Sequence, residues 1–397
     1  MSNTPARVAP RPSLLLLAII YLAFVSLGLP DSVLGVAWPA IRANLALPLE
    51  LAGILALVGT LLSALSSFTV GSLTKRFGTG PIVLVSCLLT ASGLLIYSQA
   101  PSFVFLILAG IPLGLGAGGV DSSLNAYVAK HYSARHMNWL HSFWGVGATI
   151  GPVVMTVAIA SPASWRAGYL TIAAVQLTLA LLFLVTQGLW KRNDRLNDVH
   201  SEVSEQRVGI NGANSLAAWL SVAIYMLYVT IEFSVGLWSN TVLVSSRGVA
   251  PETAGLWTAA YYGSIMVGRI LTGFVVLRFG NRAMVTFGLL TALVGSVLFF
   301  VQGVFWLPLV GLVLLGLGFA PVYPCLMHET PGRFIPGAAH VVIGRQVGGS
   351  YLAGAALPGL LGLALAHVSL ELLAPALGSV LLLLLLLVHQ LNRLSKV

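Results

Sequence analysis

Three carboxylic acids stand deep inside long apolar stretches of this sequence. They are Asp31, Asp121 and Glu232, whereas the other eight of the 11 acidic residues lie between such stretches or near their ends. A charge at the centre of a bilayer costs at least about 2.5–3.5 kcal/mol on insertion scales. A carboxyl group kept there faces a water-filled cavity, finds a partner or carries a proton, and removal from water lets it exchange that proton near neutral pH. The sequence therefore predicts proton-coupling roles for all three acids.

The neighbours of each acid on its helix support this interpretation. Residues at i, i+4, i+7 and i+11 share one helical face. The shared faces are Phe24, Gly28, Gly35 and Trp38 with Asp31; Gly114, Gly118 and Asn125 with Asp121; and Tyr225, Tyr228, Gly236 and Ser239 with Glu232. Glycines, polar groups and aromatic rings are not typical of a surface that contacts lipid, so each face is expected to point into the protein.

A second group of residues has the chemistry of a solute-binding site. Sugar sites combine flat aromatic surfaces with amide, carboxylate and imidazole groups that form hydrogen bonds. The candidates are Trp38, Asn125, His141, Trp144, Trp238, Asn240, Tyr323 and Gln346. For Trp144 an anchor at the membrane interface is an equal alternative, and His141 could instead form structural hydrogen bonds.

Helices that cross a membrane must position these residues. Hydrophobic residues make up 57% of the chain and charged residues 8%, against about 25% charged residues in a soluble domain. Blocks of roughly 20 to 27 apolar residues can each cross the hydrocarbon core as a helix, the structure that satisfies every backbone group there. The sequence predicts an all-α membrane protein whose twelve spans are about 13–40, 51–73, 81–99, 102–129, 137–160, 166–189, 216–244, 253–277, 283–302, 306–328, 338–365 and 370–391.

The basic residues predict the orientation of these spans. Fifteen of the 20 Lys and Arg residues fall on one side of the expected membrane, and only Arg42, Arg166 and Arg247 fall on the other. Because basic loops stay in the cytoplasm, we expect a multi-pass protein of the cytoplasmic (inner) membrane with both termini inside the cell. The same pattern accounts for the net charge of +9 without nucleic acid as a partner.

The chain divides into two halves that repeat a motif. The long polar segment 191–215 reads as a cytoplasmic linker between a bundle of six helices in 1–190 and another in 216–397. Gly71-Ser-Leu-Thr-Lys-Arg-Phe-Gly78 follows the second span, and Gly273-Phe-Val-Val-Leu-Arg-Phe-Gly280 follows the eighth. Two copies at equivalent places indicate a repeat. They predict gating roles for Gly71, Lys75, Arg76, Gly78, Gly273 and Arg278.

With twelve spans, a central linker and paired loop motifs, the sequence resembles the major facilitator superfamily. The resemblance implies two pseudo-symmetric bundles of six helices that rock about a site near the middle of the membrane. The loop motif of that family usually has an aspartate where this chain has Thr74 and Val276. In many members, a charge interaction that involves this motif closes the cytoplasmic side, and this chain lacks the usual acid for it. The second half could supply a substitute through Arg269, Arg278, Glu329 and Arg333.

Three shorter motifs resemble the fucose–galactose–glucose:proton symporter branch of that family. They are Gly28-Leu-Pro-Asp31, Gly114-Leu-Gly-Ala-Gly-Gly-Val-Asp-Ser-Ser-Leu-Asn125 and Leu140-His-Ser-Phe-Trp-Gly-Val-Gly147. That branch carries one acid in the first span and one in the fourth, tied to proton and sugar handling. Asp31 and Asp121 fall on those positions.

Arg345 is a basic residue about two turns inside the eleventh span. We favour a gating role for it, as a partner of Glu329 or of helix ends. The alternative is a clamp for an anionic substrate, since a guanidinium group binds carboxylates and phosphates in a fixed geometry.

No enzyme signature is present: the chain has no phosphate-cradling loop with its lysine, no zinc-ligand spacing and no nucleophile elbow. We therefore expect no cofactor and no metal, and transport driven by a gradient. The favoured function is a monomeric, proton-coupled symporter of a sugar, with solute, protons and lipid as partners. The alternatives are a drug/proton antiporter, an organic-anion carrier that needs Arg345, and a substrate sensor on the same fold that does not transport.

Overall fold

The computed structural model describes residues 14–132, 134–190, 215–334 and 336–395, which form helices and contain no strand. The helices are α1 (Leu14–Asp31), α2 (Val33–Leu45), α3 (Leu51–Phe77), α4 (Thr79–Gln99), α5 (Phe103–His131), α6 (Ala134–Ile159), α7 (Ser164–Val185), α9 (Leu216–Thr241), α10 (Pro251–Phe279), α11 (Asn281–Phe300), α12 (Leu307–Phe319), α13 (Val322–Arg333), α14 (Pro336–His367) and α15 (Leu373–Leu394). A π-helix, η2 (Val242–Ser246), follows α9, and a 3₁₀ turn, η3 (Leu370–Leu372), precedes α15. The predicted linker lies almost entirely outside the described residues.

The described residues contain twelve stretches that are long and apolar enough to cross a membrane, so the all-α fold and the number of spans are confirmed. Two of them consist of two α-helices. The first span, Leu14–Leu45, is divided at Ser32, and the tenth, Leu307–Arg333, is divided at Ala320 and Pro321. Each break lies beside a proline (Pro30 in the first case), because proline has no N–H for the helical ladder.

The two loop motifs form the same backbone turn. Gly78 has φ 85° and ψ 159°, and Gly280 has φ 78° and ψ 158°. Their N–H groups donate to the carbonyls of Thr74 (2.9 Å) and Val276 (2.8 Å). A positive φ costs glycine little, which explains why glycine stands at both positions. We call this end of the helix bundle the glycine-turn end, and the end with residues 46–50 and 247–250 the far end.

Helices of the first half (α1–α7) contact helices of the second half (α9–α15) mainly through α6 with α10, α3 with α14, and α2 with α9, with a smaller contact between α2 and α10. At the far end, Gly53 lies against Gly359, and Gly35 lies against the backbone of Gly236. Glycine removes the side chain that would hold two helix backbones apart. The far-end contacts are therefore contacts between backbones.

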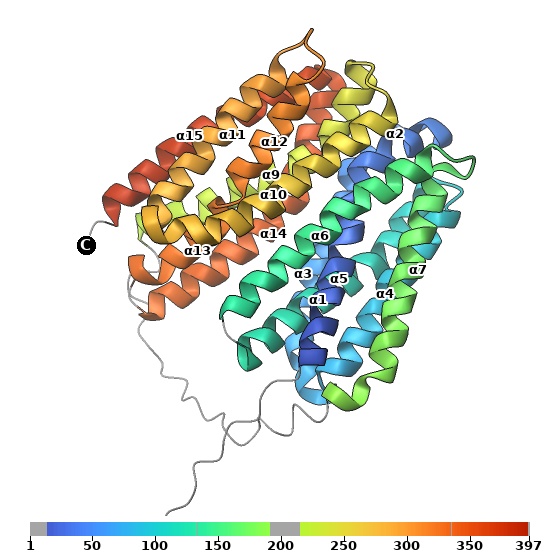
Figure 1. Cartoon of the computed structure of the whole chain (residues 1–397), viewed down its shortest axis with the longest axis horizontal. Helices are drawn as coiled ribbons and strands as arrows, with labels where there is room; N and C mark the ends of the chain where they lie inside the picture. The colour runs from blue at the N-terminus through green and yellow to red at the C-terminus, as the bar shows by residue number, and fades with distance from the viewer. Residues whose placement is uncertain (1–13, 133, 191–214, 335, 396–397) are drawn as a thin grey trace, which may run out of the picture.

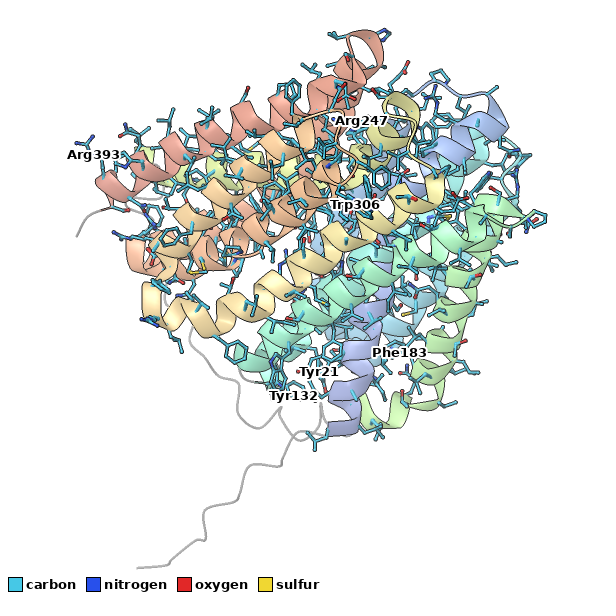
Figure 2. All side chains as sticks on the ribbon, turned by 45° about the horizontal axis from the view of Figure 1, so that its top comes forward. Tyr21, Tyr132, Phe183, Arg247, Trp306 and Arg393 are labelled. Atoms are coloured by element: carbon cyan, nitrogen blue, oxygen red, sulfur yellow. The ribbon has the colours of Figure 1, made fainter. Side chains whose placement is uncertain are left out.

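The two halves separate toward the glycine-turn end. Figure 1 shows them side by side near α2 and diverging in the other direction. A side chain built on Gly71, Gly273, Gly344 or Gly348 would meet no described atom within 4 Å. In Figure 2, Tyr21 and Tyr132 mark the glycine-turn end of the first half, and Arg247 and Trp306 mark the far end of the second. The structure is thus closed at the far end and open at the glycine-turn end.

Candidate functional site

Asp31 is the last residue of α1, beside the break at Ser32. Its side chain is exposed although it lies midway along a span of 32 residues, as expected for a group that borders an internal space. The Nε1 of Trp144 on α6 donates a hydrogen bond of 2.9 Å to Oδ2 of Asp31. Gly28 lies against the backbone of Trp144, and this close approach brings the indole within reach. The carboxylate of Asp31 thus has an uncharged partner.

Asp121 on α5 has two uncharged donors. The Nδ2 of Asn125, one turn further along α5, donates to Oδ1 at 2.9 Å. The hydroxyl of Tyr351 on α14 donates to Oδ2 at 3.2 Å, which joins the first half to the second. The carboxylates of Asp31 and Asp121 are close enough to interact electrostatically. Because like charges repel, ionisation of one carboxyl opposes ionisation of the other.

Glu232 on α9 is in a different environment. Its side chain is 10% exposed, and Nη2 of Arg269 on α10 lies 3.3 Å from its Oε1. The hydroxyl of Tyr261 donates to the backbone carbonyl of Glu232 at 3.0 Å. A buried carboxylate needs a paired cation, and Arg269 supplies it within the second half.

Arg269 also reaches toward the first half. Its guanidinium carbon lies 5.7 Å from the centre of the Trp144 ring. Trp144 thus contacts Asp31 with its N–H and Arg269 with its ring. We call Asp31, Asp121, Trp144, Glu232, Arg269 and Tyr351 the central cluster. With every acid ionised, its three carboxylates outnumber its one guanidinium by two charges.

Three of the sequence-predicted binding residues lie at the edge of the central cluster in addition to Trp144. Asn125 bonds to Asp121, His141 is exposed and interacts electrostatically with Arg269, and Tyr323 interacts electrostatically with Asp121 and Glu232. These groups offer an amide, an imidazole and two aromatic rings beside the acids.

The other predicted binding residues lie in the packed interior. Trp38 and Trp238 have no exposed surface; their Nε1 atoms donate to the carbonyls of Leu49 (2.9 Å) and Pro358 (2.8 Å). Gln346, also fully buried, bonds through Nε2 to the hydroxyls of Ser221 and Thr330. These three side chains join helices, so we leave them out of the site. Asn240 is buried at the far end of α9.

The sequence did not single out two tyrosines near the acids. Tyr351 bonds to Asp121, and Tyr262 on α10 interacts electrostatically with Glu232 and Asp31. Each had a weak signal, since each is a polar aromatic residue beside small residues in an expected span. Arg269, predicted for gating, lies in the central cluster.

At the glycine-turn end, charged residues form a network within the second half. Glu329 accepts from Arg282 at 2.9 Å and lies 3.3 Å from Arg333, which also donates to Asn392 and Ser395. The sequence did not single out Arg282. The network ties α13 to α11 and α15.

The basic residues of the loop motifs are placed differently. Arg278 and Arg76 are exposed and lie over the adjacent rings of Phe279 (5.6 Å) and Phe77 (5.2 Å). The side chain of Lys75 lies outside the described residues.

Arg345 lies outside the central cluster, six residues or about 9 Å before Tyr351 on α14. Its guanidinium carbon is 4.9 Å from the centre of the Trp219 ring. Trp219 precedes Glu232 by 13 residues on α9, or about 20 Å at a rise of about 1.5 Å per residue. The described residues contain no group of three His, Cys, Asp or Glu side chains that could hold a metal ion.

The chain was compared with known families and structures. The family model for the Major Facilitator Superfamily matches residues 20–358. The nucleoside transporter NupG superposes with a TM-score of 0.75 at 12% identity, covering 94% of this chain and 99% of that one. A D-xylose–proton symporter superposes with a TM-score of 0.70 at 15% identity, covering 94% and 96%. At these identities the structures show a shared fold.

Curated relatives are distant. The fosmidomycin resistance protein of Escherichia coli (strain K12) is 22% identical over 94% of this chain and 93% of its own length. Bypass of stop codon protein 6 of Saccharomyces cerevisiae is 24% identical, and membrane protein MosC of Rhizobium meliloti is 23% identical. Those two matches cover 54% and 70% of this chain, and 48% and 66% of the relatives' own lengths.

Proposed function

Because the chain belongs to the Major Facilitator Superfamily, a family of membrane transporters, we propose that it is a proton-coupled symporter of a small, uncharged polar solute, with a sugar as the first candidate. The observation that carries this proposal is the central cluster. Two carboxyl groups with uncharged donors lie close enough to interact electrostatically, at the place where the two halves of the chain meet. Halves 1–190 and 216–397 would rock about this point, joined by the linker 191–215.

We assign the transported proton to Asp31 and Asp121. Each carboxylate lacks a cation of its own among the described ion pairs and repels the other, so a proton bound by either relieves the repulsion. Glu232 already has the guanidinium of Arg269 as its partner. We therefore revise its predicted role from proton carrier to partner of Arg269.

Proton binding would change the contacts between the halves. The hydrogen bond from Tyr351 to Asp121 crosses the interface and is strongest when the carboxylate is charged. Protonation of Asp121 weakens it and makes separation of α14 from α5 less costly. This is a direct link between the proton and the conformational change.

The charges near the site favour an uncharged solute over an anion. The central cluster has an excess of carboxylates, and the guanidinium of Arg345 lies over Trp219, which is about 20 Å from Glu232 along α9. Trp144 and Tyr323 can stack on a sugar ring, and Asn125 and His141 can form hydrogen bonds with its hydroxyls. Similarity to a D-xylose–proton symporter and a nucleoside transporter supports a hydroxylated solute.

Export of a cationic compound in exchange for protons is the second candidate. The same excess of negative charge attracts cations. The direction of coupling separates this function from symport.

We assign the glycine-turn end to the cytoplasm, because most of the basic residues flank that end. This places both termini in the cytoplasm and the protein in the inner membrane. The arrangement described here, closed at the far end, is then the state that faces inward.

Flux measurements in proteoliposomes test the proposal. An inward proton gradient should drive accumulation of D-xylose, D-glucose or uridine above the level reached without the gradient. Accumulation of a lipophilic amine under an outward gradient, with no response of the three neutral solutes, would establish exchange instead. Binding of a solute without flux would identify a sensor.

A further inference from the structure

The far end of α9 carries three buried polar side chains, each with an atom that has no hydrogen-bond partner among the described residues. Ser239, Asn240 and Thr241 are 0%, 1% and 0% exposed. The unpaired atoms are Oγ of Ser239, Nδ2 of Asn240 and Oγ1 of Thr241. Nearly all buried polar atoms in proteins have a hydrogen-bond partner. Three consecutive residues with an unpaired buried atom therefore need an explanation.

The helix changes its winding directly after these residues. Residues Val242–Ser246 form the π-helix η2, a rare conformation that is concentrated at functional sites. Beyond it, Arg247 is fixed by Glu371 (2.6 Å) and by the carbonyl of Phe299 (2.7 Å). The unpaired residues therefore precede a widened turn whose other end is held in place, at the position labelled Arg247 in Figure 2.

Two of the three residues continue the helical face of the central cluster. Glu232, Gly236 and Asn240 follow at intervals of four, and Ser239 lies next to Asn240 on the same side. At about 100° per residue, Thr241 is turned about 140° away from Gly236. Asn240 lies about 12 Å beyond Glu232 toward the far end, at a rise of about 1.5 Å per residue.

Two contacts close this face off. The hydroxyl of Tyr262 lies directly over Gly236, and the same side chain lies near Asp31 and Glu232. On α2, Gly35 lies against the backbone of Gly236. Tyr262 thus separates the acids from Ser239 and Asn240, and α2 covers the helix at the same level.

We propose that Ser239 and Asn240 form a second binding site, for an uncharged hydroxylated solute, which becomes accessible from the far end when α2 separates from α9. A hydroxyl and an amide provide both donors and acceptors for such a solute. The solute binds there first and then passes Tyr262 to reach the central cluster. This inference rests on the proposed transport function, because it assigns an entry site to the same solute.

Cysteine accessibility tests the site without requiring transport. The variants S239C, N240C and T241C are made in a background with Cys87→Ala and Cys325→Ala, and each is treated with a membrane-impermeant thiol reagent. The far end is opened by Gly53→Trp, or by Gly359→Trp if the first variant does not fold, because these glycines lie against each other. T241C is the matched control, since it is equally buried but on another face.

The expected result is that S239C and N240C react at least tenfold faster when the far end is opened, while T241C does not change. D-xylose, D-glucose or uridine at millimolar concentration should slow the reaction of S239C in the opened protein. Equal acceleration of T241C, or no acceleration of S239C, overturns the proposal. If labelling of S239C and N240C becomes faster but none of the three solutes slows it, these residues line the moving interface without binding solute. That result also overturns the proposal. If flux measurements show no symport but the labelling pattern is as expected, the proposed transport function fails and the second site stands. The two failures can therefore be told apart.

Discussion

The two halves contribute their acids to the central cluster in different ways. In the first half, Asp31 and Asp121 accept hydrogen bonds from an indole, an amide and a phenol, all uncharged. In the second half, Glu232 is 8% exposed and faces a guanidinium group. A carboxylate with uncharged donors can take up a proton at little cost to its surroundings, whereas protonation of Glu232 would leave Arg269 without its counter-ion. The first half is thus suited to carry protons and the second to hold a fixed charge pair.

Replacement of Asp121 by Asn tests the first side of this comparison and should have the largest effect on function. We expect proton-driven accumulation to fall at least tenfold, because the amide cannot bind the transported proton. Counterflow should persist, since exchange moves no net proton, and the melting temperature should change little. Accumulation at the parent level in D121N would show that another group couples transport to protons.

Replacement of Glu232 by Gln tests the second side and should act on stability. Removing one member of a buried ion pair costs about 3–5 kcal/mol, and we expect the lower end because Arg269 is 19% exposed. A thermal-shift measurement in detergent should show E232Q melting well below D121N. The double variant E232Q with Arg269→Gln should recover part of the loss, because no charge remains unpaired. If E232Q is as stable as the parent but no longer accumulates solute, Glu232 carries a transported proton after all.

Replacement of Tyr351 by Phe sharpens the comparison at the contact between the halves. A hydrogen bond to a charged group is worth about 1.5–3 kcal/mol, so its loss should shift the balance between states by roughly tenfold or more. We expect a several-fold fall in accumulation with little loss of stability. The matched control is Tyr323→Phe, because the Tyr323 hydroxyl forms no hydrogen bond to Asp121 among the described residues. An identical effect of both variants would mean that the Asp121 bond has no special role.

Replacement of Arg345 by Gln should have the smallest effect on the affinity for solute. The guanidinium lies over Trp219, far along α9 from Glu232, so its charge is remote from the Glu232–Arg269 pair. In a counterflow assay, the solute concentration at half-saturation should stay within about twofold of the parent value. That is well under the tenfold change in affinity that about 1.4 kcal/mol represents. A selective loss of affinity for an organic anion would support the organic-anion carrier.

Much of the fold could be predicted from the sequence because a bilayer allows few solutions. Each apolar block had to be a helix, whereas the breaks at Ser32 and Ala320 were found only in the structure. Glycine at positions 78 and 280 reflects a positive φ that other residues adopt with strain. These are local constraints, so they can be read without knowing which helices touch.

The site was less predictable, because it depends on the rotation of each helix about its axis. Trp38 and Trp144 looked alike in the sequence, yet Trp38 bonds to Leu49 in the core and Trp144 to Asp31. Arg269 and Arg345 were both isolated arginines inside spans, and Arg269 alone of the two lies in the central cluster. Rotation of a helix about its axis by a few tens of degrees would move a side chain from a packed face to the interface between the halves.

The sequence by itself determined that three acids lie inside apolar spans, because position along a span follows from counting residues in a helix of fixed rise. The tertiary structure alone decided their partners. Tyr351 is 230 residues from Asp121, Trp144 is 113 from Asp31, and Arg269 is 37 from Glu232 on a neighbouring helix. Whether an acid meets a phenol or a guanidinium depends on which helices pack together, and that choice sets which carboxylates can exchange a proton.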